Sequence, residues 1–547
     1  MPPMFPELPP VLDAAGMRAV DAETINRVGI PGFTLMESAG REVARVAQEM
    51  IEINRFDEFE SDQAAPSASI CCLCGSGNNG GDGFVVARYL SAYGHKVTVV
   101  LCSNSDLQGE AKQHFEILQQ IAKEPGIELD ILTSKLSSEQ DVLETLRRLG
   151  KPDLVVDAIL GTGLQQAVRP TLVSFIEWMN ACGSPILSID IPSGLSADTG
   201  AVLGTGVDAH VTVTLASLKA GLIIGDGPDV VGALHVVDIG IPAFAVDYVC
   251  SDAREIRLSS NGYVRSRLPE PHRTDHKFTT GPCLVVGGSD SYTGAPVLAS
   301  QAAGRSGSGY VVCIGPASIL RVLQEKLTEI PVASWDDTPS ETAAQHLVER
   351  LDSRWEKAKS LLIGPGLGRE KGLPIFIKTL LTHFKGPVVL DADALPALAG
   401  QKDWVQKNSA GKWIFTPHEG ELNKLCGESP LEQTNPGISR IETARSFAKD
   451  WNVVLLLKGF PTLVALPSGA VVINATGQAS AATAGSGDVL AGVIAGFLSR
   501  GLSPADAAIC GIHVAGTATD LYVEENAPGT MMAGDILSFI PRLLSEL

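Results

Sequence analysis

The chain has 547 residues, of which 45% are hydrophobic and 19% are charged. This length is too great for one hydrophobic core and predicts about two to four globular domains, and the composition argues against a largely disordered protein. The net charge of −20 makes the chain a poor candidate for nonspecific nucleic-acid binding, because nucleic-acid phosphates would be repelled. We therefore expect no nucleic-acid partner.

The chain begins with MPPMFPELPPVL, which has no basic region and is interrupted by prolines, so we expect no signal peptide. No run of about 18 apolar residues occurs, and we expect no transmembrane helix and no membrane partner. Cys71, Cys72 and Cys74 lie in one apolar run. They could form a metal cluster, but no second Cys/His pair follows at zinc spacing, which favours buried thiols in a reducing cytoplasm.

Residues 16–51 read as two helices broken at 29–32 (GIPG). After a polar loop, strand-like runs alternate with helix-like segments: SICCLC, KVTVVLC, DLVVDAIL, PILSIDI, HVTVTLA and ALHVVDIG. This alternation predicts an α/β fold, with a mainly parallel sheet that helices cover on both faces.

Residues 251–280 are polar and basic, and we place the domain boundary there, giving domains 1–250 and 251–547. A second alternating set follows: PCLVVGG, YVVCIG, SLLIGPGLG, GPVVLDADAL, KWIFTPHEGE, VVLLLKG and PTLVALPSGAVVIN. The chain then ends in helix-like segments around VLAGVIAGFLSRG and AAICGIHVAGTATDLYV. The second domain is thus predicted to be α/β as well.

Three polar loops follow strands of the first domain: GSGNNGGDG (75–83), Asp157 with GTGLQQA (161–167), and DIPSG (190–194). In open α/β sheets, ligands bind beyond the carboxyl ends of the strands. GSGNNG matches the G-x-G-x-x-G dinucleotide turn, but no acidic residue ends the next strand, and Asp82 would oppose a pyrophosphate. Alternatively, Asn79, Asp157 and Ser193 converge on a monovalent cation, which one carboxylate with neutral oxygens would suit. The same residues could instead cap loops and a helix.

In this order, NNGGDG, VDAILGTG and DIPSG resemble the N-terminal domain of the NAD(P)H-hydrate repair enzymes, the hydrate epimerase, over roughly residues 16–242. That family usually has Asn where Ser38 stands. The resemblance implies a Rossmann-like three-layer domain with K⁺ bound by Asn79, Asp157 and Ser193. It also implies that the hydrated nicotinamide nucleotide contacts Asn78, Asn79, Gly80, Gly81, Asp82, Gly161, Thr162, Gly163, Leu164, Gln165, Gln166, Ala167 and Asp190.

The implied reaction exchanges the R and S hydrates at ring carbon C6. It needs a group that moves a proton, so that the hemiaminal can open and reclose. Asp190 is the candidate for this role. Lys219, in TLASLKAG, is a weaker electrostatic candidate, and the alternative is an ordinary surface lysine.

The tightest motif of the second domain is TAGSGDVLAG (483–492). Gly485 to Gly487 can present backbone N–H groups at the start of a helix, whose dipole favours an anion. Asp488, in the same first turn, could complement that dipole or act as a general base for a hydroxyl that attacks a phosphoryl group. His418, in TPHEGE, could be a surface or capping residue or could contact substrate. Asp391 and Asp393 could be metal-linked carboxylates or loop caps.

In this order, GGSDSYTGAP, GPGLG, TPHEGE and GSGDVLAG resemble the ADP/ATP-dependent NAD(P)H-hydrate dehydratase, which has a ribokinase-like fold, over about 260–547. Its usual Ala-Gly is Ser308-Gly309 here, and Ala484 replaces a Ser before GSGD. The resemblance implies that Ala295, Gly366, His418 and Asp488 contact the hydrate. It also implies that Lys458, Gly459, Phe460, Pro461, Thr462 and Gly487 contact the adenine nucleotide, with Mg²⁺ bridging its phosphates.

The sequence thus predicts a bifunctional repair enzyme, an epimerase followed by an S-specific dehydratase, with NADH or NADPH hydrates and ADP or ATP as substrates. The layout resembles prokaryotic members, which implies ADP as the usual donor, and we expect a homo-oligomer. The alternative is a ribokinase-type small-molecule kinase with a regulatory, non-catalytic N-terminal binding domain. The fold and GSGD are compatible with both, whereas TPHEGE and GPGLG favour the dehydratase.

Overall fold

The computed structural model describes residues 4–56, 67–103, 105–133, 139–250, 255–270, 272–274, 276–277, 280–336, 338–427 and 440–547. The chain divides into two compact units, one formed mainly by Pro10–Ser251 and the other by Asp252–Leu547 together with Pro3–Pro9. Phe5 and Leu8, from the start of the chain, are buried in the core of the second unit. In the described ranges, no helix combines the length and apolar character needed to span a membrane.

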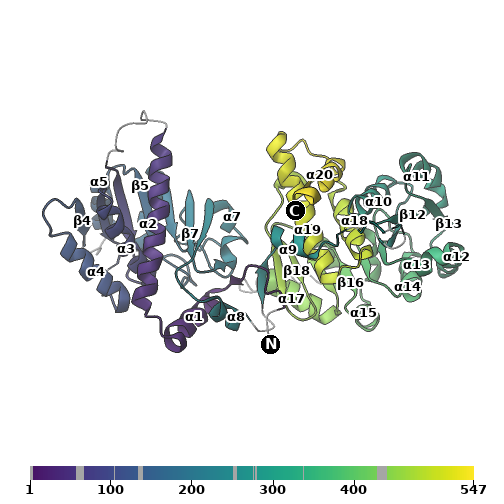
Figure 1. The fold of residues 1–547 in the computed structure, drawn as a ribbon, viewed down its shortest axis with the longest axis horizontal. Coiled ribbons are helices and arrows are strands. Elements are labelled where there is room, and N and C mark those ends of the chain that lie inside the picture. The colour runs from purple at the N-terminus through teal and green to yellow at the C-terminus, as the bar shows by residue number, and fades with distance from the viewer. Residues whose placement is uncertain are drawn as a thin grey trace. The chain divides into compact units, whose positions relative to one another are not determined.

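The first unit contains a seven-stranded sheet in which every strand pair is parallel (Figure 1). Its strands in spatial order are β4 (Leu129–Leu132), β3 (Lys96–Leu101), β2 (Ser69–Cys74), β5 (Leu154–Ala158), β6 (Ile186–Ile189), β7 (Val211–Leu215) and β9 (Ala233–Val237). The direction of winding reverses between β2 and β5. Loops that follow strands on the two sides of such a point diverge and leave room for a ligand.

Helices cover both faces of this sheet, which makes the unit three-layered. On one face lie α2 (Gly32–Phe56), α3 (Asn78–Ala92) and α4 (Gly109–Ile121), and on the other α5 (Glu139–Leu149) and α6 (Pro170–Ala181). Because successive strand residues point to opposite faces, Cys72 and Cys74 pack with the first group and Cys71 with the second. All three are buried, free thiols, as the sequence predicts.

The N-terminal part of the first unit lies against the remaining short elements. Strand β1 (Val11–Leu12) pairs in parallel with β8 (Leu218–Lys219), and α1 (Ala14–Ala22) packs on α8 (Ala243–Val249). A π-helical turn (Glu23–Val28) continues α1 and ends at Gly29, whose φ of 88° needs a glycine. The predicted helix break therefore falls between this turn and α2. The short α7 (Gly227–Val230) precedes β9.

The second unit contains a ten-stranded sheet, parallel except for β18, which runs antiparallel to both neighbours (Figure 1). Its strands in spatial order are β10 (Ile256–Leu258), β19 (Val471–Asn474), β18 (Thr462–Ala465), β17 (Val454–Leu457), β16 (Trp413–Phe415), β15 (Val388–Leu390), β14 (Ser360–Ile363), β11 (Pro282–Val286), β12 (Tyr310–Pro316) and β13 (Val332–Trp335). Here the winding reverses between β14 and β11.

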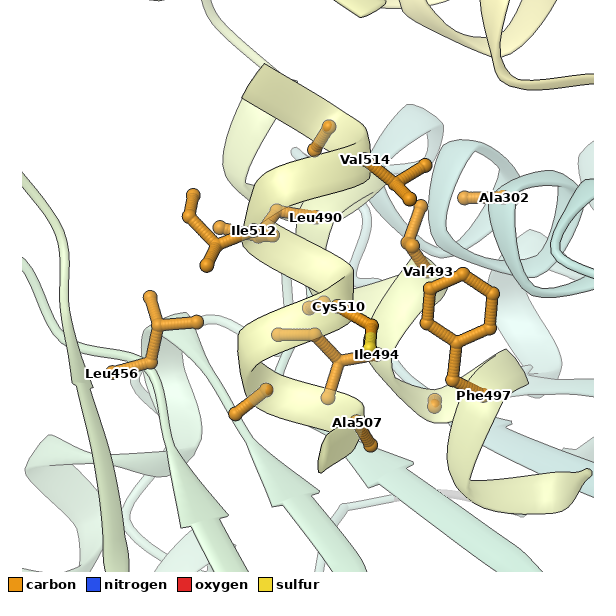
Figure 2. Packing of buried hydrophobic residues seen from close by; sticks show 14 of the residues in the cluster. Ala302, Leu456, Leu490, Val493, Ile494, Phe497, Ala507, Cys510, Ile512 and Val514 are labelled. Carbon is orange, nitrogen blue, oxygen red and sulfur yellow. The ribbon is translucent and has the colours of Figure 1, made fainter. Parts of the chain in front are cut away.

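The core of the second unit contains α9 (Asn261–Arg267), α10 (Gly294–Arg305), α18 (Ser486–Ser499), α19 (Pro504–Glu525) and α20 (Ala533–Glu546). Figure 2 shows Phe497 and Val493 of α18 beside Cys510 and Val514 of α19. A Cβ on Gly492 would lie 2.2 Å from the Ala299 carbonyl oxygen. The glycine therefore lets α18 pack closely on α10, which fixes the position of its N-terminus.

The other helices of the second unit lie between β12 and β17 in the chain. They are α11 (Leu320–Lys326), α12 (Glu341–Leu351), α13 (Ser353–Lys357), α14 (Leu373–His383), α15 (Lys402–Ser409), α16 (Glu419–Cys426) and α17 (Arg440–Trp451).

Candidate active sites

A cavity of about 1030 Å³ lies at the carboxyl ends of β2, β5 and β6 in the first unit. The site residues expected from the sequence that line it are Asn78, Asn79, Asp82, Gly161, Thr162, Gly163, Leu164, Gln165, Gln166, Ala167 and Asp190. The fold therefore brings the three predicted loops together around one space. Lys219 lines the cavity as well, and so does Asp21, which the sequence analysis missed.

Gly80 and Gly81 lie in the first turn of α3 but are not among the residues that line the cavity. A Cβ on Gly80 would lie 2.0 Å from the Gly75 carbonyl oxygen, and one on Gly81 would lie 2.6 Å from Met36 Sδ. These glycines therefore allow the start of α3 to pack against the turn after β2 and against α2. This packing presents Asn78, Asn79 and Asp82 to the cavity.

The three residues predicted to bind a cation are close together. Asp157 is fully buried, and its Oδ1 accepts a 2.6 Å hydrogen bond from Ser193 Oγ. The Ser193 backbone N–H donates to Asp157 Oδ2 at 2.8 Å. Asn79 Nδ2 donates to the carbonyl oxygen of Leu160 at 3.0 Å, and the N–H of Leu160 donates to Ser193 Oγ at 2.8 Å. Asn79 and Ser193 thus both bind the backbone of Leu160, and Ser193 also binds Asp157.

These residues fit a monovalent cation. Asn79 Oδ1 is buried and accepts no hydrogen bond from the described residues, and a bound cation would remove the cost of this unpaired acceptor. Burial raises the pKa of Asp157 despite the hydrogen bonds from Ser193, so a nearby positive charge would also stabilise its ionised form. Within the described ranges, no group of three or more His, Cys, Asp and Glu suits a metal. One carboxylate with neutral oxygens is the set that K⁺ would use here.

Lys219 is not a surface residue, and that alternative interpretation is wrong. Its side chain is 1% exposed, and its Nζ donates to Asp190 Oδ1 at 2.5 Å, to the Leu215 carbonyl at 2.7 Å and to Thr214 Oγ1 at 3.1 Å. Asp190 has a φ of 65°, a left-handed conformation that is uncommon outside glycine and that accumulates at functional sites. Asp190 and Lys219 form an ion pair in the cavity wall, in which the lysine is buried and the aspartate is partly exposed.

In the second unit, the GSGD motif forms the start of α18. Gly485 is the N-cap, with a φ of 93°, and a Cβ there would lie 2.8 Å from Leu298 Cδ1 of α10. Asp488 is in the first turn of α18. A Cβ on Gly487 would be 3.4 Å from Lys458 Nζ. Lys458 therefore reaches the helix N-terminus, where exposed N–H groups favour an anion.

A cluster of carboxyl groups surrounds Lys458. Its Nζ lies 2.9 Å from Asp391 Oδ1 and 3.7 Å from Glu421 Oε2. Burial alone would lower the pKa of Lys458, but Asp391 and Glu421 raise it above its usual value. Burial, followed by the charge of Asp391, raises the pKa of Asp488 to about 7, with Lys458 opposing the shift. Asp488 can therefore exchange a proton at neutral pH.

Asp391, Glu421 and Asp488 face Lys458 and together exceed its charge, whereas Asp393 interacts with Arg369. This excess of negative charge suits a bound cation. Mg²⁺ is commonly held by one or two protein carboxylates, with nucleotide phosphates and water as its other ligands. Among these groups, Asp391 also accepts from Thr416 Oγ1 at 2.8 Å. Asp393 accepts from the Gly368 N–H at 2.8 Å, as a loop cap would.

Residues 458–461 form the connection between β17 and β18, and Thr462 is the first residue of β18. Arg440, which the sequence analysis missed, donates from Nη2 to the Lys458 carbonyl at 2.9 Å and from Nη1 to the Pro461 carbonyl. A Cβ on Gly459, whose φ is 143°, would lie 2.2 Å from Arg440 Nη2. Arg440 thus fixes the loop, while Phe460 remains 59% exposed.

The remaining predicted contacts fall into two groups. A Cβ on Gly366 would lie 3.0 Å from Ala295 Cβ, so these two residues are neighbours. His418 is the N-cap of α16, where its Nδ1 accepts from the Gly420 N–H at 3.0 Å. The capping interpretation is therefore confirmed. His418 Nε2 also lies 3.6 Å from Glu421 Oε1, and Glu421 links it to Lys458.

Two α/β units, each with polar loops at the carboxyl ends of its strands, define a two-domain, two-site protein. Residues 32–221 match the family model of the YjeF-related protein N-terminus, and residues 283–542 match that of NAD(P)H-hydrate dehydratase. The chain is 39% identical to the bifunctional NAD(P)H-hydrate repair enzyme Nnr of Salinibacter ruber, over 98% of this chain and 96% of that protein. It is 38% identical to the protein of the same name from Moorella thermoacetica, over 98% and 97%. The chain belongs to the family of bifunctional NAD(P)H-hydrate repair enzymes, as its motifs indicate.

A solved structure similar to the second unit is the ADP/ATP-dependent NAD(P)H-hydrate dehydratase from Bacillus subtilis, co-crystallised with ATP and Mg²⁺. It is 27% identical to this chain, with a TM-score of 0.43, and the match covers 52% of this chain and 97% of that one.

Proposed function

We propose that this chain repairs hydrated NADH and NADPH in two steps. The first unit exchanges the R and S hydrates. The second unit converts the S hydrate to NAD(P)H and consumes ADP, giving AMP and phosphate, or ATP, giving ADP and phosphate. Membership of the family over the full length supports this assignment, as does the presence of a complete polar site in each unit.

In the first unit, the observation that carries the proposal is the 1030 Å³ cavity that collects three separate loops around Asp190. Segments 78–82 and 161–167 would hold the hydrated nucleotide. Asn79, Asp157 and Ser193 would hold K⁺, which would supply a fixed positive charge beside the cavity. Asp190, paired with Lys219, would accept the proton of the C6 hydroxyl, so that the hemiaminal opens and can reclose on its other face.

In the second unit, the observation that carries the proposal is Asp488, with its pKa of about 7, at the N-terminus of α18. Asp488 would take the proton of the C6 hydroxyl as this oxygen attacks the terminal phosphoryl group. Phosphate then leaves C6 with the electrons of the C–O bond, and loss of a proton from C5 restores the C5–C6 double bond. A nucleotide is consumed because hydroxide leaves poorly.

The groups around Asp488 would bind the rest of the reactants. N–H groups of Gly485 and Gly487 would stabilise the charge of the transferred phosphoryl group. Residues Lys458 to Thr462 would bind the adenine nucleotide, whereas Ala295, Gly366 and His418 would contact the hydrate. Mg²⁺, held with the nearby carboxylates, would neutralise the nucleotide phosphates.

The test is to incubate the purified full chain separately with R and S hydrates of NADH, with ADP or ATP, and to follow the absorbance of reduced nicotinamide. We expect recovery from both epimers, and an enzyme-free sample gives the spontaneous rate. Recovery from the S hydrate alone would reject the epimerase. No recovery from either epimer, with phosphorylation of another small-molecule hydroxyl, would favour the ribokinase-type kinase.

A further inference from the structure

Seven charged side chains line the cavity of the first unit, three of which are Arg18, Glu110 and Arg169. The other four, three carboxyl groups and one ammonium group, form a cluster. They belong to Asp21 of α1, Asp82 of α3, Asp190 after β6 and Lys219 of β8. The four groups interact electrostatically with one another. One ammonium cannot compensate three ionised carboxylates, so the cluster is built to keep at least one proton.

Asp190 and Asp82 differ sharply in their surroundings. Asp190 is the direct ion-pair partner of Lys219, with Oδ1 and Nζ 2.5 Å apart. Asp82 is only 7% exposed, yet its carboxyl group makes no hydrogen bond or ion pair with any residue that the structure describes. It faces the cavity, and its carboxyl group has no partner among the described residues. Such a group is available to a ligand and costs least in its neutral form.

The electrostatics agree with this geometry. Burial raises the pKa of Asp82 well above its usual range, the charges of Asp190 and Asp21 raise it further, and Lys219 opposes them. Burial also raises the pKa of Asp21, with Lys219 opposing and Asp190 adding to the shift. The cavity therefore places a carboxyl group that forms an ion pair beside one whose neutral form is favoured by burial, and acid–base catalysis needs two such groups.

Opening a hemiaminal requires two proton transfers at different atoms. The C6 hydroxyl must lose its proton as the carbonyl forms, and N1 must gain one as the C6–N1 bond breaks. We propose that Asp82 is the general acid that protonates N1 while Asp190 accepts the hydroxyl proton. This assignment rests on the proposed epimerase function of the first unit and adds the group that completes its chemistry.

Electron pairs and protons are conserved in the ring opening. The O–H electron pair becomes the C6–O π bond, the C6–N1 pair moves to N1, and the proton of Asp82 goes to N1. The product is an open amino aldehyde, with Asp190 protonated and Asp82 ionised. Rotation about the C5–C6 bond turns the other carbonyl face towards N1. The reverse transfers then close the ring as the opposite epimer and restore both carboxyl groups.

The test uses the full chain with Asp82→Asn, which has nearly the shape of a protonated Asp82 but cannot donate its proton. We expect kcat for R-to-S exchange, followed by chromatographic separation of the hydrates, to fall by about 100-fold or more. KM, melting temperature and conversion of the S hydrate by the second unit should be little changed. The matched control is Glu116→Gln, which removes an exposed carboxylate of the same unit that does not line the cavity, and it should exchange within about threefold of wild type.

The pH profile separates acid catalysis from a structural role. In the wild type, exchange should decline at high pH as Asp82 loses its proton. Asp21→Asn removes a charge that raises the pKa of Asp82, so the declining limb should move to lower pH. The assignment would be overturned if Asp82→Asn exchanged the epimers with a kcat near that of the wild type, or if only its KM changed. A wild type that recovers NAD(P)H only from the S hydrate would instead overturn the epimerase function, and this assignment with it.

Discussion

Lys219 Nζ lies 2.5 Å from Asp190 Oδ1, and the same ammonium also donates to the Leu215 carbonyl and to Thr214 Oγ1. Asp190 is thereby held in a left-handed backbone conformation, with φ of 65°, at the wall of the cavity. The lysine is almost fully buried, so its charge is partly freed from solvent screening. The pair fixes the position of the Asp190 carboxyl group in the cavity wall.

Replacing Lys219 by Met should remove epimerase activity and lower the free energy of unfolding of the first unit. Removal of one partner from a buried ion pair typically costs about 3 kcal/mol or more, because the remaining charge is left uncompensated. Hydrogen exchange of β5 and β6 during chemical denaturation measures the loss in the first unit. The control, Lys151→Met, replaces an exposed lysine of the same unit and should cost under about 0.5 kcal/mol. Similar losses in both variants would contradict the structural importance of the pair.

K⁺ should stabilise the first unit through Asn79, Asp157 and Ser193. Because burial raises the pKa of Asp157, ionising this group costs stability in the folded state. Without K⁺, this contribution to the free energy of unfolding should therefore fall as the pH rises through the raised pKa, and K⁺ should recover part of the loss. The measurement is the melting temperature in KCl and LiCl at equal ionic strength.

Asn79→Leu tests whether the K⁺ effect arises at this site, because it removes the buried oxygen that has no hydrogen-bond partner among the described residues. The variant should lose the difference between KCl and LiCl. If wild type and Asn79→Leu respond equally to K⁺, the ion acts elsewhere.

Asp488 should set the pH dependence of the dehydratase. Its pKa of about 7 means that it is protonated, and unable to act as a base, in more acidic solution. The kcat/KM for the S hydrate should therefore rise with pH through an apparent pKa of about 7 and then level off. Asp488→Asn should lower kcat/KM by about 100-fold or more, since it removes the base. A flat profile across neutral pH would argue against this role.

The N-terminal segment should stabilise the second unit, although the first unit follows it in the chain. Phe5 is 5% exposed in that core, and its backbone N–H donates to the buried Glu255 carboxylate at 3.2 Å. Phe5→Ala should therefore cost about 3–5 kcal/mol. Tryptophan fluorescence reports this unit, because five of the 6 tryptophans, all except Trp178, lie in residues 252–547.

Glu7→Ala is the matched control for Phe5→Ala. It removes only a half-exposed ion pair with Arg267 and should cost under about 1 kcal/mol. Unchanged unfolding in Phe5→Ala would show that the segment does not contribute to the core of the second unit.

Much of the candidate site could be predicted from the sequence because its residues cluster in short loops after strands. The carboxyl ends of parallel strands meet at one edge, so the sequence alone predicts that Asn79, Asp157 and Ser193 converge. The GSGD motif is similarly local, since the glycines and Asp488 lie in one helical turn.

The rest depends on contacts between distant segments. Asp21 lies on α1, outside every loop motif, and enters the cavity only through the packing of that helix. Arg440 acts on residues 458–461 through space. The burial of Lys219 follows from the pairing of β8 with β1 and from its buried partners. None of these relationships leaves a periodic or spacing signal in one sequence.

The assignment of two successive activities to two units is tested most directly by complementation. Asp190→Asn should recover NADH from the S hydrate but not from the R hydrate beyond the spontaneous rate, whereas Asp488→Asn should recover it from neither. Mixed in the presence of ADP, the two variant proteins should restore recovery from the R hydrate, because one supplies the exchange and the other the dehydration. Failure of the mixture to recover NADH, while wild type succeeds under the same conditions, would contradict the account.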